Sequence, residues 1–240
     1  ETINFPPDSY KKILPPSISS DGSLYGPRAT AIRTKILIKS VDMIDTLAMR
    51  IGLSLQIRMR WRDSRLQFKD AFPNEKKVLD KKTSERLWVP LDYVTHVNAE
   101  IGNIWPDQNR KIYVNVMSNF SEATFKFSPY NTYEHLSYDG ISSELEIRQR
   151  FRIRYKCTYR MTNYPFDEQT CQFKMKIKAL NGRNVTFVED YPGVQYVGDN
   201  LIKQFKIIDV RSFIKDLKER SFNGSVSLFI FELTMDRNYY

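Results

Sequence analysis

Residues 157–171 read CTYRMTNYPFDEQTC and hold the only two cysteines of the 240-residue chain. Cys157 and Cys171 lie fourteen positions apart, and Tyr164-Pro165-Phe166-Asp167-Glu168-Gln169 stands just before the second cysteine. By themselves the two residues are compatible with one disulfide or with two buried thiols. A metal or redox site is disfavoured because no histidine stands near them. No metal site and no cofactor is therefore expected.

The composition indicates an extracellular protein with a basic surface. Lys and Arg outnumber Asp and Glu by 37 to 28, which gives a net charge of +9. The basic residues mostly alternate with apolar ones, which favours solvated strand faces over a nucleic-acid interface. Three N-x-S/T triplets, at Asn119, Asn184 and Asn223, join the cysteine pair in indicating an oxidising compartment and glycosylation. No stretch approaches the ~20 apolar residues of a membrane helix, so we expect a soluble chain whose signal peptide, if any, has been removed.

Three stretches alternate apolar and polar side chains with the period of two that is typical of half-buried strands. They cover residues 51–62, 144–155 and 173–179, and the polar face of the second carries an arginine at every second position from Arg148 to Arg154. Further strands are expected at 32–39, 111–117, 205–213 and 226–235. Residues 41–45, most of 64–86 and 189–200 are expected to be connections. A short helix is expected at 8–14, within an N-terminal segment of residues 1–29.

The fold class that follows is all-β. About ten strands with almost no helix predict an antiparallel, immunoglobulin-like β-sandwich. The length favours a single domain with its sandwich in residues 30–236.

Five motifs in order give the chain a family resemblance. Besides the cysteine stretch, they are Trp61-Arg62-Asp63-x-Arg65-Leu66, Trp88-Val89-Pro90, Asp139-Gly140 and Arg237-Asn238-Tyr239-Tyr240. With these motifs the chain resembles the extracellular, ligand-binding domain of a Cys-loop pentameric ligand-gated ion channel, in a divergent animal member. The resemblance implies a Cys157–Cys171 disulfide, four further subunits of the same or a related chain, a small-molecule agonist, and a place on the extracellular face of the plasma membrane. It also implies that residues 237–240 lead into a first transmembrane helix.

In this family the cysteine loop touches the membrane domain and carries the opening signal. The resemblance therefore implies a coupling role for an apolar tip, Tyr164, Pro165 and Phe166, beside Asp167. Tyr164-Pro165 is a candidate cis peptide bond. We expect Arg237 to be held between Asp167 and one of Asp42 or Asp45. The alternative is an exposed ion pair that contributes little.

The family's ligand site lies between neighbouring subunits. One subunit would supply Tyr93 after Trp88, Lys178 and Leu180 after the second cysteine, and Phe213 and Phe222 near the last two strands. This set does not form the aromatic cage that holds a cationic amine. The other subunit would supply a basic strand face with Gln56, Arg58, Arg148 and Arg150. Arg58 and Arg150 stand where glycine- and GABA-type members carry arginine, so the ligand is expected to be anionic or amino-acid-like. The alternative is that these arginines pair with acids across the interface or face water.

Other functions remain open at this point. No Ser/His/Asp spacing, metal cluster or phosphate-binding glycine loop is present, so the chain is not expected to be an enzyme. His96 and His135 are expected to be ordinary surface or structural residues. A secreted binding protein of the same fold without a pore is the first alternative, and a nucleic-acid or polyanion binder is the second.

Overall fold

The protein is an elongated β-structure, here seen in a computed structural model. The structure describes residues 3–4, 10–16, 29–69, 76–101, 111–117, 124–128, 131–178, 184–202, 204–218 and 225–238. The strands, in chain order, are β1 (Ile3–Asn4), β2 (Thr30–Asp45), β3 (Arg50–Trp61), β4 (Gln67–Lys69), β5 (Lys76–Val78), β6 (Thr95–Val97), β7 (Ala99–Ile101), β8 (Lys111–Val116), β9 (Thr124–Ser128), β10 (Asn131–Asp139), β11 (Ser143–Lys156), β12 (Glu168–Lys178), β13 (Val185–Tyr196), β14 (Leu201–Ile202), β15 (Phe205–Lys218) and β16 (Ser225–Arg237). One α-helix, α1 (Lys81–Arg86), and one 3-10 helix, η1 (Pro90–Tyr93), complete the described elements.

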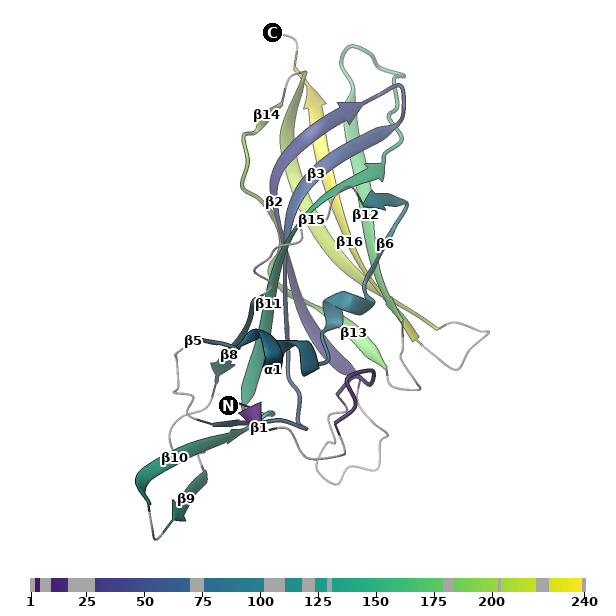
Figure 1. The fold of residues 1–240 in the computed structure, drawn as a ribbon. Helices are drawn as coiled ribbons and strands as arrows, with labels where there is room; N and C mark the ends of the chain where they lie inside the picture. The colour runs from purple at the N-terminus through teal and green to yellow at the C-terminus, as the bar shows by residue number, and fades with distance from the viewer. Residues whose placement is uncertain are drawn as a thin grey trace.

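Two large sheets run along the long axis of the molecule (Figure 1). The first has the order β13-β2-β3-β11-β8-β5, with β7 also paired to β11, and the second has the order β14-β15-β16-β12-β6. A small sheet, β1-β4-β10-β9, lies at the end of the molecule opposite the C-terminus (Figure 1). The all-β sandwich is confirmed, with one departure from the antiparallel expectation, because β13 and β2 run parallel.

The core forms where the apolar faces of the two large sheets meet. The odd-numbered residues of β3 from Ile51 to Trp61 are all buried, as their alternation predicts. The Phe173 ring of β12 packs between Tyr155 of β11 at 4.8 Å and Phe231 of β16 at 4.9 Å, measured between ring centroids. Each fully buried ring of this kind stabilises the fold by roughly 1.5–3 kcal/mol. This packing joins the sheets next to the cysteine loop.

The helix lies elsewhere than expected. Of the segment 8–14, the structure describes residues 10–14, and these form a turn in which the Leu14 amide donates to the Lys11 carbonyl at 3.0 Å. The helix is α1, in a stretch where the charged sequence indicated a loop. The Asp80 side chain accepts from the Thr83 amide at 3.0 Å and caps the N-terminus of α1. The capping signal is a single acid followed by two lysines, a pattern that is also typical of a charged loop.

Two expected connections belong to strands. Residues 41–45 continue β2, and most of the stretch 189–200 belongs to β13. In both places local turn signals, acidic residues in one and Tyr191-Pro192-Gly193 in the other, are overridden by pairing with a neighbouring strand. The strands are also more numerous than the ten expected, because short pieces such as β4 to β7 pair along the edges.

A bulge interrupts β13 between Glu189 and Val194. Tyr191-Pro192 is cis, and Gly193 adopts φ of 71°. A side chain at Gly193 would overlap the Glu189 carboxylate and the Ser212 hydroxyl, which hydrogen-bond to each other. Glycine therefore suits this position for two reasons: it adopts a positive φ without strain, and it has no Cβ.

Replacing Gly193 by alanine is expected to lower the free energy of unfolding by about 2 kcal/mol, from the positive φ and from loss of the Glu189–Ser212 hydrogen bond. Urea denaturation of the two proteins measures the difference. Gly52→Ala is the control, because its Cβ would meet Met43 at 3.3 Å with no positive φ. Equal losses in the two variants would contradict the role of the bulge.

Candidate functional site

The cysteine loop is closed by a disulfide and braced from inside. Cys157 and Cys171 are bonded, with their Cα atoms 5.3 Å apart, and both are buried. The Gln169 side chain spans the loop: it accepts from the Arg160 amide at 2.8 Å and donates to the Arg160 carbonyl at 2.7 Å. The same amide group donates to Asp167 at 2.6 Å. The loop thus presents Asp167 in a fixed orientation.

Asp167 and Arg237 form a bidentate ion pair. Arg237 Nε lies 2.6 Å from Asp167 Oδ1, and Nη2 lies 2.9 Å from Oδ2. Both side chains are buried, with 2 % of Asp167 and 9 % of Arg237 exposed. The hydrogen bonds from the Arg237 guanidinium hold the pKa of Asp167 below its usual value. The guanidinium also lies over the rings of Tyr164 at 5.0 Å and Phe205 at 4.6 Å.

Asp42 and Asp45 take other partners among the described residues. Asp42 accepts from Ser40 at 2.5 Å and lies 3.7 Å from Arg152, while Asp45 accepts from the amides of Leu47 and Ala48. That one of these two carboxylates also helps to hold Arg237 stays a prediction. Because Asp45 closes the β2–β3 turn, its carboxylate is already used locally.

The β2–β3 turn and the cysteine loop lie at the end of the molecule where the C-terminus lies (Figure 1), and both carry exposed apolar side chains. Leu47 in the β2–β3 turn is 96 % exposed, and Tyr164 and Phe166 in the cysteine loop are 66 % and 77 % exposed. Tyr164-Pro165 is cis, as the sequence suggested. The turn and the loop are neighbours, because the Cys157 amide donates to the Met49 carbonyl at 2.9 Å. An exposed apolar group of this kind is typical of a contact surface.

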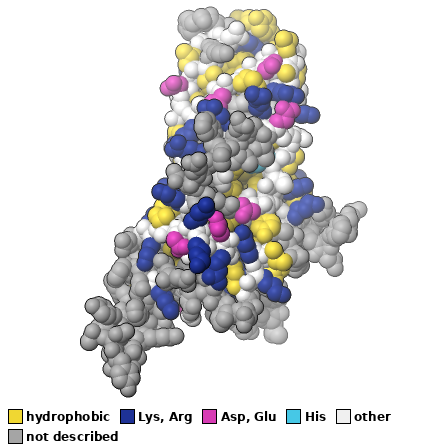
Figure 2. Space-filling view, in the orientation of Figure 1, with side chains coloured by type: hydrophobic (Ala, Val, Ile, Leu, Met, Phe, Trp, Pro, Cys, Tyr) yellow, Lys and Arg dark blue, Asp and Glu magenta, His cyan; other side chains and the backbone are white. Residues whose placement is uncertain are grey.

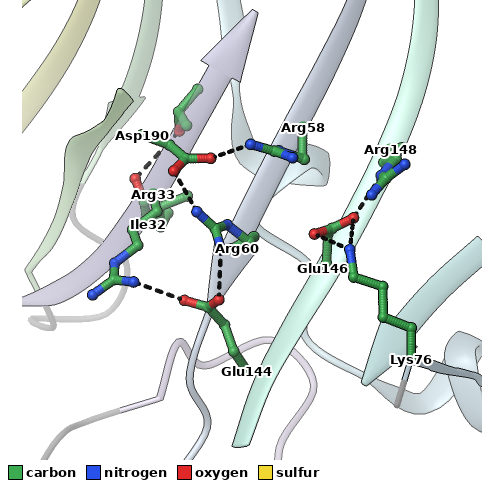
Figure 3. Close-up of polar contacts among 10 residues, drawn as sticks. Ile32, Arg33, Arg58, Arg60, Lys76, Glu144, Glu146, Arg148 and Asp190 are labelled. Carbon is green, nitrogen blue, oxygen red and sulfur yellow. Dashed lines mark hydrogen bonds and ion pairs between the residues drawn. The ribbon is translucent and has the colours of Figure 1, made fainter. Parts of the chain in front are cut away.

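A basic face forms on the outer side of the first sheet. The register of β3 and β11 sets Arg58 opposite Arg148 and Gln56 opposite Arg150, so the four residues predicted from the sequence lie together. Arg58 donates to Asp190 of β13 at 2.6 Å, and Arg148 donates to Glu146 at 2.5 Å (Figure 3). Arg150 is exposed, and among the described residues no hydrogen bond or ion pair is found for it. Arg150 and Gln56 thus form the open part of the face.

Three carboxylates in this face were missed by reading the sequence. Asp190 also accepts from Arg60, Glu144 pairs with Arg60 at 3.2 Å and Arg33 at 3.5 Å, and Glu146 lies 3.2 Å from Lys76 (Figure 3). Glu144 and Glu146 share the parity of the arginines on β11, so alternation could have placed them there. Asp190 could not be found in this way, because its position depends on the pairing of β13 with β2.

The structure describes three of the five residues that we expect the other subunit to supply to the ligand site. Tyr93 stacks on Trp88 with ring centroids 6.0 Å apart, Lys178 ends β12 with an exposed side chain, and Phe213 on β15 is 39 % exposed. Leu180 and Phe222 lie outside the described residues. So do Asn119 and Asn223, whereas Asn184 is exposed and accepts from Ser225 at 3.0 Å.

His96 takes the structural one of the two roles expected for it. Its ring is half-buried beside β11, with Nδ1 2.7 Å from the Tyr155 hydroxyl, and this burial lowers its pKa to about 4. The side chain of His135 lies outside the described part.

Two features are not found among the described residues, a metal-binding cluster and a membrane-spanning helix. In that part of the chain no group of three or more His, Cys, Asp or Glu residues is placed to hold a metal ion. Among its helices, none is long and apolar enough to cross a bilayer. Lys and Arg side chains are interleaved with Asp and Glu over the visible face and do not form one block (Figure 2).

Comparison with known proteins gives one family. The model of the neurotransmitter-gated ion-channel ligand binding domain matches residues 8–239. Similar curated proteins include the gamma-aminobutyric acid receptor subunit beta of Caenorhabditis elegans, 21 % identical over 76 % of this chain and 29 % of its own length. The gamma-aminobutyric acid receptor subunits pi of Bos taurus and Rattus norvegicus are each 24 % identical over 74 % of this chain and 32 % of their own length. The chain thus spans about a third of the curated relatives it matches.

Proposed function

Because this chain belongs to the family of neurotransmitter-gated ion-channel ligand-binding domains, a family of channels and not of enzymes, we propose that it binds a small anionic or amino-acid-like agonist between subunits of a pentamer. The binding signal then passes to a pore through the cysteine loop. In this proposal the domain lies outside the cell, on a receptor anchored in the plasma membrane.

The observation that carries the ligand class is the guanidinium of Arg150, for which no ion-pair partner is found in the part of the chain that the structure describes. It stands beside Gln56 on an exposed sheet face, while its neighbours Arg58 and Arg148 are held by carboxylates of the same chain. A planar guanidinium fork binds a carboxylate through two parallel hydrogen bonds, and the Gln56 amide supplies a further donor. Because Arg150 is exposed, a ligand from solution can reach Arg150 and Gln56.

The exposed apolar end supports the coupling role. Leu47, Tyr164 and Phe166 would dock against a membrane domain, and the buried Asp167–Arg237 pair fixes the loop that carries two of them to the last strand. A secreted binding protein without a pore would gain nothing from exposing these side chains to water. This contrast favours the channel over the soluble alternative.

Arg150→Ala in the full-length receptor is expected to raise the half-maximal concentration of an acidic or zwitterionic amino acid agonist about 10- to 100-fold. The reason is loss of a charge-assisted, bidentate hydrogen bond. Two-electrode recording from oocytes, with glycine, gamma-aminobutyrate and glutamate as probes, measures the shift.

Arg154→Ala is the matched control, because Arg154 is exposed on the same face of β11, opposite Gly52. It should change the agonist response less than threefold. If the two variants respond alike, the ligand does not bind at Arg150.

A further inference from the structure

Asp190 places a carboxylate of the chain itself on the basic face. It is 14 % exposed and receives Arg58 Nη2 at 2.6 Å on one oxygen and Arg60 Nη2 on the other (Figure 3). Each oxygen thus meets a different guanidinium. An anionic ligand head would form the same pair of charge-assisted contacts on this surface.

The bulge in β13 is what brings Asp190 there. Between Glu189 and Val194 the register with β2 is interrupted, and two successive acids reach different partners. Glu189 hydrogen-bonds to Ser212 on β15, in the second sheet, while Asp190 reaches across to β3 in the first. Asp190 therefore belongs to an irregular segment, while the arginines it holds stand on a regular strand.

The two arginines differ in how far they depend on Asp190. Arg60 has a second carboxylate partner, Glu144, at 3.2 Å. For Arg58 the structure describes Asp190 alone, and the buried Nε of Arg58 has no hydrogen-bond partner among the described residues. Removing Asp190 would leave Arg60 paired and Arg58 ready to accept another anion.

The register sets how a ligand would use a freed Arg58. Arg58 lies opposite Arg148, and Arg150 lies opposite Gln56, so Arg58 and Arg150 are diagonal neighbours. Diagonal positions of an antiparallel pair lie ~7–8 Å apart at Cα, within reach of two carboxylates on a five-carbon chain. Arg148 is not available for this, because Glu146 holds it at 2.5 Å.

We propose that Asp190 is a specificity-determining residue: its carboxylate competes with the anionic ligand for Arg58 and sets how strongly the basic face binds small dicarboxylates. This deepens the proposed function, on which it rests for the location of the ligand. With Asp190 in place a monoanion is held at Arg150, and a dicarboxylate reaches Arg58 only by displacing Asp190.

The test is calorimetric titration of the 240-residue chain with glutarate. Asp190→Asn is expected to lower the dissociation constant for glutarate about tenfold, because an internal competitor that forms charge-assisted hydrogen bonds is gone. The control Asp209→Asn removes an exposed acid of β15 and should leave the constant unchanged. Adding Arg58→Gln to Asp190→Asn should abolish the gain. Equal binding by wild type and Asp190→Asn overturns the proposal.

A second pair of variants covers the case in which Asp190→Asn fails to fold. Arg60→Gln and Arg60→Gln/Asp190→Asn differ only at Asp190, and the double variant removes one charge of each sign. The double variant should bind glutarate about tenfold more tightly than Arg60→Gln alone, and equal binding overturns the proposal.

Different experiments would overturn the competition by Asp190 and the proposed ligand position. Unchanged agonist response in Arg150→Ala and Arg58→Ala receptors would overturn the ligand position, whereas unchanged glutarate binding on loss of Asp190 overturns the competition.

Discussion

Asp167→Asn is expected to lower the free energy of unfolding by about 3–5 kcal/mol and to abolish opening of the full-length channel. The substitution removes the carboxylate that pairs with the Arg237 guanidinium, which is 9 % exposed. A buried charge that loses its partner retains the full cost of leaving water. The loss therefore exceeds the net contribution of the ion pair itself.

The functional loss has the same cause. Asp167 joins the cysteine loop to Arg237 at the end of β16, and the Arg237 amide also donates to the Asp167 carbonyl at 3.2 Å. Loosening this pair would let the loop and the last strand move independently. The opening signal would then no longer reach the membrane domain.

Guanidinium denaturation measures the stability, and agonist-evoked current at matched surface expression measures the opening. Glu168→Gln is the control, since Glu168 is the next residue along the chain and is exposed. A double-mutant cycle with Arg237→Gln should give a coupling energy of at least 2 kcal/mol. Additive effects of the two substitutions, or normal currents in Asp167→Asn, would show that the pair has no such role.

The core strands were predictable because one physical pattern decides them. In β3, in β12 and in the part of β11 from Arg150 to Lys156, buried side chains alternate with partly or fully exposed ones, and only a period of two satisfies that arrangement. The disulfide and the Asp167–Arg237 pair were anticipated through the resemblance, which placed the loop and the C-terminal segment at one end. For these features, local sequence and order along the chain were sufficient.

What the sequence did not reveal depends on contacts between distant segments. The stretch 189–196 carries a turn signal in Tyr191-Pro192-Gly193, yet it pairs with β2, a strand near the start of the sequence. Asp190 reaches Arg58 across 132 positions, and only the bulge directs it there. No local pattern in one sequence reports such a pairing. Within the basic face, therefore, the arginines were predicted and the acid that holds Arg58 was not.

Acidification from pH 7 to pH 4 is expected to destabilise the wild-type chain by about 2–3 kcal/mol through His96 alone. His96 lies on β6, and its Nδ1 is 2.7 Å from the hydroxyl of Tyr155, which is buried in the core. The ring also packs beside Phe151 with centroids 5.9 Å apart. These two neighbours are uncharged, and burial lowers the pKa of His96 to about 4.

The direction of this change in stability follows from the protonation of His96 in the folded and in the unfolded chain. Above pH 6.5 His96 is neutral in both states, and the full stability is present. Between pH 6.5 and 4 the unfolded chain takes up a proton that the folded chain refuses, so the unfolded state is favoured progressively. The Asp167–Arg237 pair does not add to the change between pH 6.5 and 4. Because the folded-state pKa of Asp167 is lowered, the stabilisation by this pair is lost only as the pH falls below about 4.

His96→Gln should flatten the dependence on pH, because glutamine keeps a polar partner for Tyr155 and takes up no proton. Urea unfolding at pH 7, 6, 5 and 4.5 measures the slope for both proteins, and His135→Gln removes the only other histidine as a control. Most of the loss between pH 7 and 4.5 should disappear in His96→Gln and persist in His135→Gln. If the slope of wild type is retained in His96→Gln, the acid sensitivity comes from other groups, and the half-buried position of His96 carries no penalty for protonation.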